Sequence, residues 1–125
     1  MLLSDIDHVQ LAAPTGCEAA AREFFGRLLG LPEIEKPEAL RSRGGCWFQV
    51  GSRQLHVGVD PNFRPAAKAH VAVATQDIDA LSSVLGKAGV QCVWDQALGG
   101  VRRFYASDPW GNRLEFTEPT SRVAR

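Results

Sequence analysis

The stretch RRFYASDPWGNRLEF, residues 102–116, predicts two strands joined by a tight turn. An Asp-Pro pair opens the turn and a Gly-Asn pair closes it, while apolar residues alternate along both flanks. On the second strand, Glu115 faces away from its neighbours Leu114 and Phe116. Strands are poor in Glu, and an unpaired buried carboxylate is costly. Glu115 is therefore either a solvated surface residue or the partner of a cation or metal.

The length and charge of the chain restrict its function class. We expect a single domain, residues 1–125, because a chain of this length can bury a hydrophobic core without stabilisation by disulfide bonds or structural metal ions. Fourteen basic residues balance fourteen acidic ones, so no overall positive field favours nucleic acid or an anionic membrane. The N-terminus has neither a signal-peptide pattern nor an apolar run long enough to span a membrane. We expect a soluble, cytoplasmic protein whose partner is a small molecule.

The three cysteines indicate neither a disulfide framework nor a thiolate metal site. Their number is odd, and no two of them have Cys-x-x-Cys spacing. We expect Cys17, Cys46 and Cys92 to be reduced and partly buried.

The first half of the chain predicts a strand, a helix and three further strands. Thr15 and Glu18 have capping-box spacing at the start of the helix, which Gly30 follows. The expected elements are a strand over 6–12, a helix from the cap through Leu29, a strand near residue 33 followed by a mobile loop to residue 43, and a hairpin over 46–59.

The second half repeats this order, which predicts an internal duplication. Its expected elements are strands over 68–74, 90–94 and 101–106, a helix over 77–88 capped by Asp77, and the hairpin quoted above. In the two halves His8 corresponds to His70, Phe48 to Phe104, and His56 to Glu115. We infer two βαβββ modules, module one over about residues 5–60 and module two over about 68–119.

The chain has only three histidines, and all three occupy matching strands of the repeat. Each one alone is typical of a hydrogen-bonded core residue. Together with the carboxylate they favour a site for a divalent metal such as Zn, Ni, Fe, Co or Mn, and not for Ca²⁺. The predicted metal ligands are His8, His56, His70 and Glu115.

Three segments, DHVQLA, AREFFGRLLGL and FYASDPWGNRLEF, give the chain a resemblance to the vicinal oxygen chelate superfamily. This superfamily groups glyoxalase I, extradiol dioxygenases, fosfomycin-resistance transferases, methylmalonyl-CoA epimerase and bleomycin-binding proteins. The resemblance covers residues 6–119. It implies an α+β fold of two tandem βαβββ modules, forming a curved, incompletely closed mixed sheet with helices on the outer face. It also implies metal ligands at His8, His70 and Glu115, with His56 at a position where glyoxalase I commonly has Glu.

The resemblance implies a metal-dependent lyase or isomerase of the glyoxalase I type, acting on a small substrate that chelates through vicinal oxygens. An Fe(II)-dependent extradiol dioxygenase is an alternative, because Phe104-Tyr105 and Glu115 fit its spacing, although residues 96–98 lack the histidine expected there. A metal-free binding protein of the bleomycin-resistance type is another alternative. The fosfomycin type is weaker, because residues 94–100 contain no Lys or Arg.

Strand parity places Arg103 and Tyr105 on the face of Glu115, together with Trp47 and Gln49 in module one. We expect Arg103 to hold a substrate oxygen, Tyr105 to donate a hydrogen bond, and Glu115 to take part in proton transfer. Alternatively, Arg103 pairs with Asp95 or Asp108. The resemblance also implies a homodimer, with the site either within one chain or across the interface.

Overall fold

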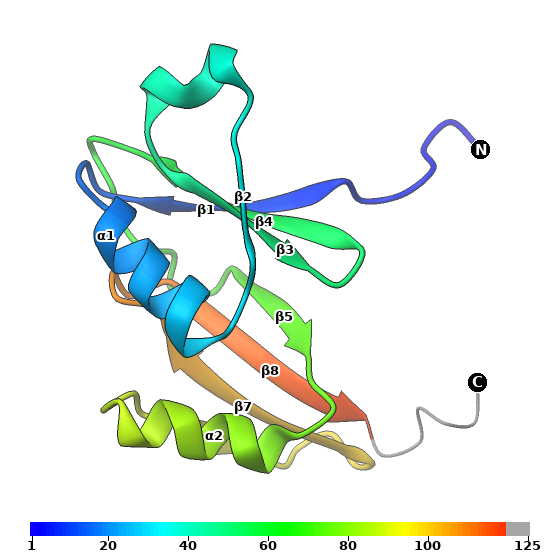
Figure 1. Cartoon of the computed structure of the whole chain (residues 1–125). Helices are drawn as coiled ribbons and strands as arrows, with labels where there is room; N and C mark the ends of the chain where they lie inside the picture. The colour runs from blue at the N-terminus through cyan, green and yellow to red at the C-terminus, as the bar shows by residue number, and fades with distance from the viewer. Residues whose placement is uncertain (120–125) are drawn as a thin grey trace. The chain divides into compact units, whose positions relative to one another are not determined.

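Each half of the chain folds around a four-stranded mixed sheet (Figure 1). The structure, a computed structural model, describes residues 1–119 and forms two compact units that divide between Pro65 and Ala66. We describe each unit as one module. The α+β class and the duplicated modules predicted from the sequence are confirmed.

Module one has the sheet order β1-β4-β3-β2, in which β1 runs parallel to β4 and the other pairs are antiparallel. Its elements are β1 (His8–Ala13), α1 (Glu18–Ala21), the π-helix η1 (Arg22–Leu28), β2 (Glu33–Ile34), the 3-10 helix η2 (Glu38–Arg43), β3 (Cys46–Val50) and β4 (Arg53–Val59).

Module two has the equivalent order β5-β8-β7-β6. As in module one, the strands that come first and last in the chain, here β5 and β8, run parallel. Its elements are β5 (His70–Ala74), α2 (Ile78–Lys87), β6 (Val93–Asp95), β7 (Val101–Ser107) and β8 (Arg113–Pro119). Helix α2 lies along one face of the β7 and β8 pair (Figure 1).

Alternate residues of the central strands form the core between each sheet and its helix. In module one the rings of Phe25 and Phe48 lie 5.8 Å apart, and both are buried. In module two Phe104 is fully buried, with its ring 5.3 Å from Phe116. Burial of each such side chain contributes about 1.5–3 kcal/mol. The opposite faces of both sheets are thereby left for polar residues.

The strand register corrects one predicted correspondence. Trp47 lies opposite His56, and Tyr105 lies opposite Glu115, so Trp47 is the counterpart of Tyr105. The predicted match of Phe48 with Phe104 is therefore wrong by two residues. Relative to the partner strand, β7 begins three residues earlier than β3, so counting from the start of each strand misaligns the two. Because the mismatch of two residues is even, every side chain keeps its predicted face.

The first helix differs from the prediction at its start and along its length. Its N-cap residue is Cys17, and Thr15 does not cap it. Glu18 instead accepts a hydrogen bond of 2.6 Å from the backbone N–H of Gly45, which ties the helix to the start of β3. From Arg22 onward the backbone is π-helical. The predicted capping box is wrong because this long-range bond takes the Glu18 carboxylate.

The segment expected to be a strand and then a loop contains a strand and a second helix. Glu33–Ile34 pairs with β3 as predicted, and η2 then follows Pro37. Figure 1 shows η2 as the coil at the top of module one, beyond the ends of β2 and β3. Module two has no corresponding helix among its described residues.

The turn that closes the quoted hairpin is built by Asp108. One of its carboxylate oxygens accepts from the backbone N–H groups of Trp110 (3.1 Å) and Asn112 (2.8 Å), and the other accepts from the Asn112 amide (2.8 Å). Burial raises the pKa of the Asp108 carboxyl, and these hydrogen bonds oppose the rise. Asp108 therefore acts within the turn and does not pair with Arg103.

The three thiols are free, and Cys17 and Cys46 are buried. Burial raises the pKa of Cys46 to about 11, which keeps it protonated at neutral pH. None of the helices in residues 1–119 is long and apolar enough to cross a membrane.

Replacing Asp77 with Ala is expected to lower the free energy of unfolding by about 1 kcal/mol. The Asp77 side chain accepts a 3.0 Å hydrogen bond from the N–H of Ala80 at the start of α2, and Ala cannot replace that bond. Denaturant unfolding measures the change. Asp77→Asn is the control, because Asn also caps helices. An equal loss in both variants would show that capping is not the cause.

Candidate functional site

In module two, His70 and Glu115 meet on the polar face of the sheet. They stand on the neighbouring strands β5 and β8, and His70 Nε2 lies 2.9 Å from Glu115 Oε1. The other ring nitrogen of His70, Nδ1, lies 3.1 Å from the backbone carbonyl oxygen of Lys68. Glu115 is 8% exposed, so its carboxylate is largely removed from water.

A 2.9 Å contact between a ring nitrogen and a carboxylate oxygen has either a proton or a cation between its two atoms. A carbonyl oxygen only accepts, so the contact with Lys68 favours the tautomer of His70 that carries its proton on Nδ1. A neutral ring would then turn the lone pair of Nε2 toward a carboxylate oxygen, which is repulsive. A proton on Nε2, or a metal cation between the two atoms, makes the contact attractive. Two adjacent ligands bonded to one metal at about 2.1 Å lie roughly 3 Å apart, which matches the observed contact.

Arg103 holds the far side of Glu115. Its guanidinium lies 3.4 Å from Glu115 Oε2 and 3.0 Å from Asp95 Oδ2, and its side chain is 19% exposed. The predicted alternative of an Asp95 pair is thus present, together with a contact to the proposed metal ligand. The Nε of Arg103 is buried and has no hydrogen-bond partner among the described residues. This geometry indicates that Arg103 orients Glu115; its contact with a substrate remains a prediction.

Tyr105 lies beside this group and has a free hydroxyl. Its ring centroid is 5.6 Å from that of His70 in an edge arrangement, and the Arg113 guanidinium stacks over it at 4.0 Å. Within residues 1–119 its hydroxyl makes no hydrogen bond. The hydroxyl is therefore available to donate to a bound molecule, as the sequence predicts.

In module one, His8, His56 and Trp47 form a stack of rings on the equivalent face. The rings of His8 and His56 lie 4.1 Å apart, and those of His56 and Trp47 lie 3.8 Å apart and nearly parallel. Strand β4 carries His56 between β1 and β3, directly opposite Trp47, while His8 lies on β1 opposite Gln54, two residues from His56. The stack fixes the orientation of both imidazoles.

Each imidazole of module one also has one ring nitrogen fixed by an oxygen. His8 Nδ1 lies 2.8 Å from Asp7 Oδ1, and His56 Nε2 lies 2.9 Å from Gln54 Oε1. Both oxygens accept, so the protons sit on those nitrogens, and the lone pairs are on Nε2 of His8 and Nδ1 of His56. Metal-binding histidines commonly have such a partner on the second nitrogen.

The donor chemistry of both pairs fits a divalent metal. His8 and His56 offer nitrogen lone pairs, and His70 with Glu115 requires a cation or proton. In the described part of the chain, no group of three or more His, Cys, Asp or Glu side chains clusters as a metal site. Each module thus brings together its own pair of the predicted ligands, and the four-ligand set remains a prediction.

The metal-free protein is expected to lose stability below pH 6.5 through His56. Burial lowers the pKa of its imidazole, and the charges of His8 and Lys36 lower it further. The unfolded chain therefore binds this proton first as the pH falls through about 6.5, which favours unfolding, whereas nothing is lost above that pH. Denaturant midpoints of chelator-treated protein at several pH values measure this. The decline should be smaller in His56→Gln; equal declines would contradict the assignment.

Comparison with known families identifies the group to which these modules belong. The model of the Glyoxalase/Bleomycin resistance protein/Dioxygenase superfamily matches residues 5–116. The chain belongs to this superfamily. No curated protein matches the chain. A solved glyoxalase family protein from Bacillus anthracis is 50% identical, with a TM-score of 0.92, over 95% of this chain and 98% of its own.

Two less similar solved structures share the fold. Lactoylglutathione lyase from Agrobacterium tumefaciens is 19% identical over 94% of this chain and 96% of its own, with a TM-score of 0.73. The fosfomycin resistance protein FosX from Listeria monocytogenes, in a mutant form complexed with Mn(II) and 1S,2S-dihydroxypropylphosphonic acid, is 17% identical over 99% of this chain and all of its own, with a TM-score of 0.79. At these identities the likeness shows the fold alone.

Several contacts of the site are not predicted by the sequence of this glyoxalase-superfamily chain. The Lys68 carbonyl, the Gln54 amide and Asp7 fix the histidine rings, yet nothing in the local pattern distinguishes them from other strand residues. The Arg103 to Asp95 contact follows from their opposite positions in β6 and β7. A prediction of β6 that reached residue 95 would have favoured Asp95 over Asp108.

Proposed function

We propose that the protein is a metal-dependent lyase or isomerase of the glyoxalase I type, acting on a small substrate with vicinal oxygens. The observation that carries the proposal is the contact between His70 and Glu115, which needs a cation or proton between the two side chains. The FosX structure with Mn(II) supports metal use in this superfamily. The lactoylglutathione lyase structure supports the reaction class.

In this proposal His8, His56, His70 and Glu115 hold the metal, either within one chain or between two chains of a homodimer. When bound, a divalent metal polarises substrate oxygens and stabilises developing negative charge. Glu115 moves the proton next to the substrate carbonyl. Arg103 holds Glu115 Oε2 and so leaves Oε1 on the side of His70. Tyr105 donates its free hydroxyl to a substrate oxygen.

Metal-dependent isomerisation of a 2-oxoaldehyde hemithioacetal tests this function. The purified protein should convert the hemithioacetal, lose that activity on chelation, and regain it when Mn²⁺, Ni²⁺ or Zn²⁺ is returned. Tyr105→Phe should lower the turnover and leave metal binding unchanged. Turnover that is indifferent to chelator would exclude the proposal.

The alternatives give different results in the same assays. Oxygen uptake with Fe²⁺ and a catechol would support the extradiol dioxygenase instead; Tyr105 favours it, since its ring lies against His70. Tight binding of a small molecule that chelator does not affect would support a metal-free protein of the bleomycin-resistance type.

We also propose a homodimer in the cytoplasm. For the assembly, one chain with His8→Ala can be mixed with another carrying His70→Ala. If each site is shared between chains, the mixed dimer regains metal at one of its two sites. That site combines the unmutated module one of the His70→Ala chain with the unmutated module two of the His8→Ala chain. If each site lies within one chain, the mixed dimer does not regain metal. Light scattering measures the dimer, and cell fractionation measures the location.

A further inference from the structure

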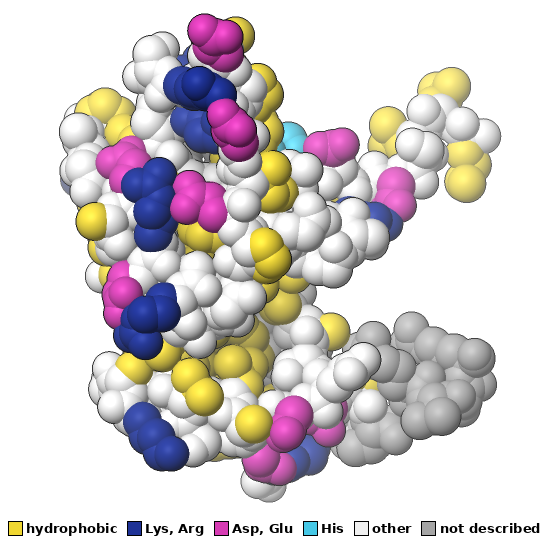
Figure 2. Space-filling view, viewed as in Figure 1, with side chains coloured by type: hydrophobic (Ala, Val, Ile, Leu, Met, Phe, Trp, Pro, Cys, Tyr) yellow, Lys and Arg dark blue, Asp and Glu magenta, His cyan; other side chains and the backbone are white. Residues whose placement is uncertain are grey.

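Module one contains a small cavity whose charged lining residues are all basic. We call it the basic pocket; its lining includes Gln10, Lys36, Leu40, Arg43, Trp47 and Gly58. Its volume is about 170 Å³, and its lining has two cationic side chains and no acidic one. The larger cavity beside β2 mixes Glu18, Glu33 and Glu35 with basic residues. The cavity beside β6 includes Asp95. Over the face seen in Figure 2, basic and acidic side chains lie next to one another, whereas the lining of the basic pocket has basic ones alone.

The basic pocket depends on a segment that breaks the repeat between the modules. The connection between β2 and β3 spans residues 35–45 and contains η2, which carries Leu40 and Arg43. The corresponding connection between β6 and β7 spans only residues 96–100. The fold does not require the longer connection, because module two forms the same sheet order without it. This argues for a function particular to module one.

The two cations of the basic pocket are free to bind a ligand. Arg43 makes no hydrogen bond or ion pair with any residue in 1–119, whereas Arg41, on the same helix, pairs with Glu35. Lys36 donates one hydrogen bond to the Gly44 carbonyl, which positions the ammonium group and leaves its other N–H groups available. Binding of an anion therefore need not break an existing ion pair.

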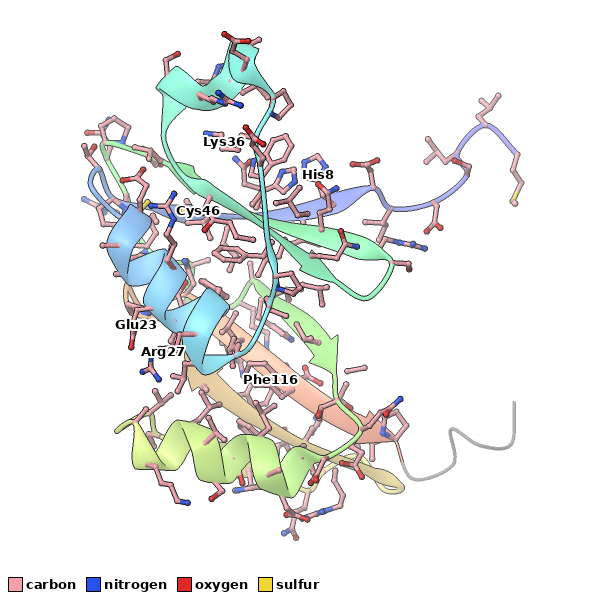
Figure 3. The ribbon with its side chains drawn as sticks, viewed as in Figure 1. His8, Glu23, Arg27, Lys36, Cys46 and Phe116 are labelled. Carbon is pink, nitrogen blue, oxygen red and sulfur yellow. The ribbon has the colours of Figure 1, made fainter. Side chains whose placement is uncertain are left out.

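The basic pocket adjoins the histidine pair of module one. Trp47 lines the pocket and also stacks on His56. Figure 3 shows Lys36 and His8 on the same side of the module-one strands. Lys36 also lies near enough to His56 to act on it electrostatically. A molecule held in the pocket can thus extend toward the imidazoles.

We propose that the basic pocket binds an oxyanion group of the substrate, a carboxylate or a phosphate-like group, through Lys36 and Arg43. This proposal rests on the proposed function, because it assigns a negative charge to the substrate of that site. The volume corresponds to about five or six water molecules, which suits a tetrahedral oxyanion or a carboxylate on a short stem. Trp47 and Leu40 supply apolar walls for that stem.

Titration of metal-free protein with inorganic phosphate tests the basic pocket apart from the metal. Amide shifts of residues 36 and 43–47 should saturate in the wild type. Binding should be at least about tenfold weaker in the Lys36→Gln, Arg43→Gln double variant, because charge-assisted hydrogen bonds are lost. Arg41→Gln is the matched control, since it removes the same charge from the same segment outside the pocket lining. It should change the affinity by less than about twofold.

Three results would overturn the proposal: no saturable phosphate binding, an equal loss in Arg41→Gln, or unchanged binding in Arg43→Gln. Arg43→Gln is also measured alone, because an exposed side chain can be replaced without unfolding the module. A parallel Mn²⁺ titration separates this proposal from the proposed function. Phosphate binding without metal binding would reject the metal enzyme and retain the pocket. Metal binding without phosphate binding would reject the basic pocket as an oxyanion site and retain the metal enzyme.

Discussion

Replacing Glu115 with Gln is expected to weaken Mn²⁺ and Zn²⁺ binding by at least about 100-fold. Loss of a residue that only supports a metal ligand commonly costs 10- to 100-fold, and Glu115 is proposed as a ligand itself. Gln preserves the shape but removes the negative charge that faces His70 at 2.9 Å and Arg103 at 3.4 Å. Isothermal titration of protein freed of metal by chelation measures the affinity. The hemithioacetal activity should fall together with it.

Glu23→Gln is the matched control for this charge change. Glu23 is exposed on η1, and within residues 1–119 its one ion pair is with Arg27, four residues along the helix (Figure 3). Its replacement should leave the metal affinity unchanged. If Glu115→Gln also kept the wild-type metal affinity, Glu115 would be a structural partner of His70 and Arg103 and not a metal ligand. The contact between His70 and Glu115 would then be an ordinary hydrogen bond.

Replacing Phe104 with Ala is expected to lower the free energy of unfolding by about 3–5 kcal/mol. Phe104 is fully buried, and its ring lies 5.1 Å from Trp94 and 5.3 Å from Phe116. A loss of this size is a large part of the total stability of a small domain, which is about 5–15 kcal/mol. Because β7 also carries Arg103 and Tyr105, partial unfolding of this strand should reduce metal binding as well.

Chemical denaturation followed by circular dichroism measures the Phe104 effect. Val93→Ala is the control, because Val93 is an apolar residue of the same module with 53% of its surface exposed. Its cost should stay below about 0.5 kcal/mol. A loss of less than about 1 kcal/mol in Phe104→Ala would show that the core of module two does not depend on this ring.

Local sequence patterns predict most of the fold, because alternation and turn chemistry act over a few residues. The turn at Asp108 and the cap at Asp77 both form as expected. The errors arise from contacts distant in sequence. The bond from Glu18 to Gly45 replaces the predicted cap, and the longer β7 changes the match of Phe48. An even shift in register leaves the alternation unchanged, so the alternation could not reveal it.

For the candidate site, parity places the side chains on a face but says nothing about their partners. It correctly puts His56 with Trp47, and Glu115 with Tyr105, on the polar faces. It cannot predict that the Lys68 carbonyl fixes the His70 ring, because a backbone atom of any residue type can do so. These partners decide which nitrogen carries a lone pair, and hence whether a metal fits.

The metal content of protein purified without chelator tests the central proposal most directly. Elemental analysis of the wild type should find a divalent metal close to one per site. His70→Ala should contain almost none, while Gln76→Ala, a substitution at an exposed position of the same module, should match the wild type. Equal metal content in the wild type and His70→Ala, or none in the wild type even after incubation with Mn²⁺, Ni²⁺ or Zn²⁺, would contradict a metal site built on these histidines.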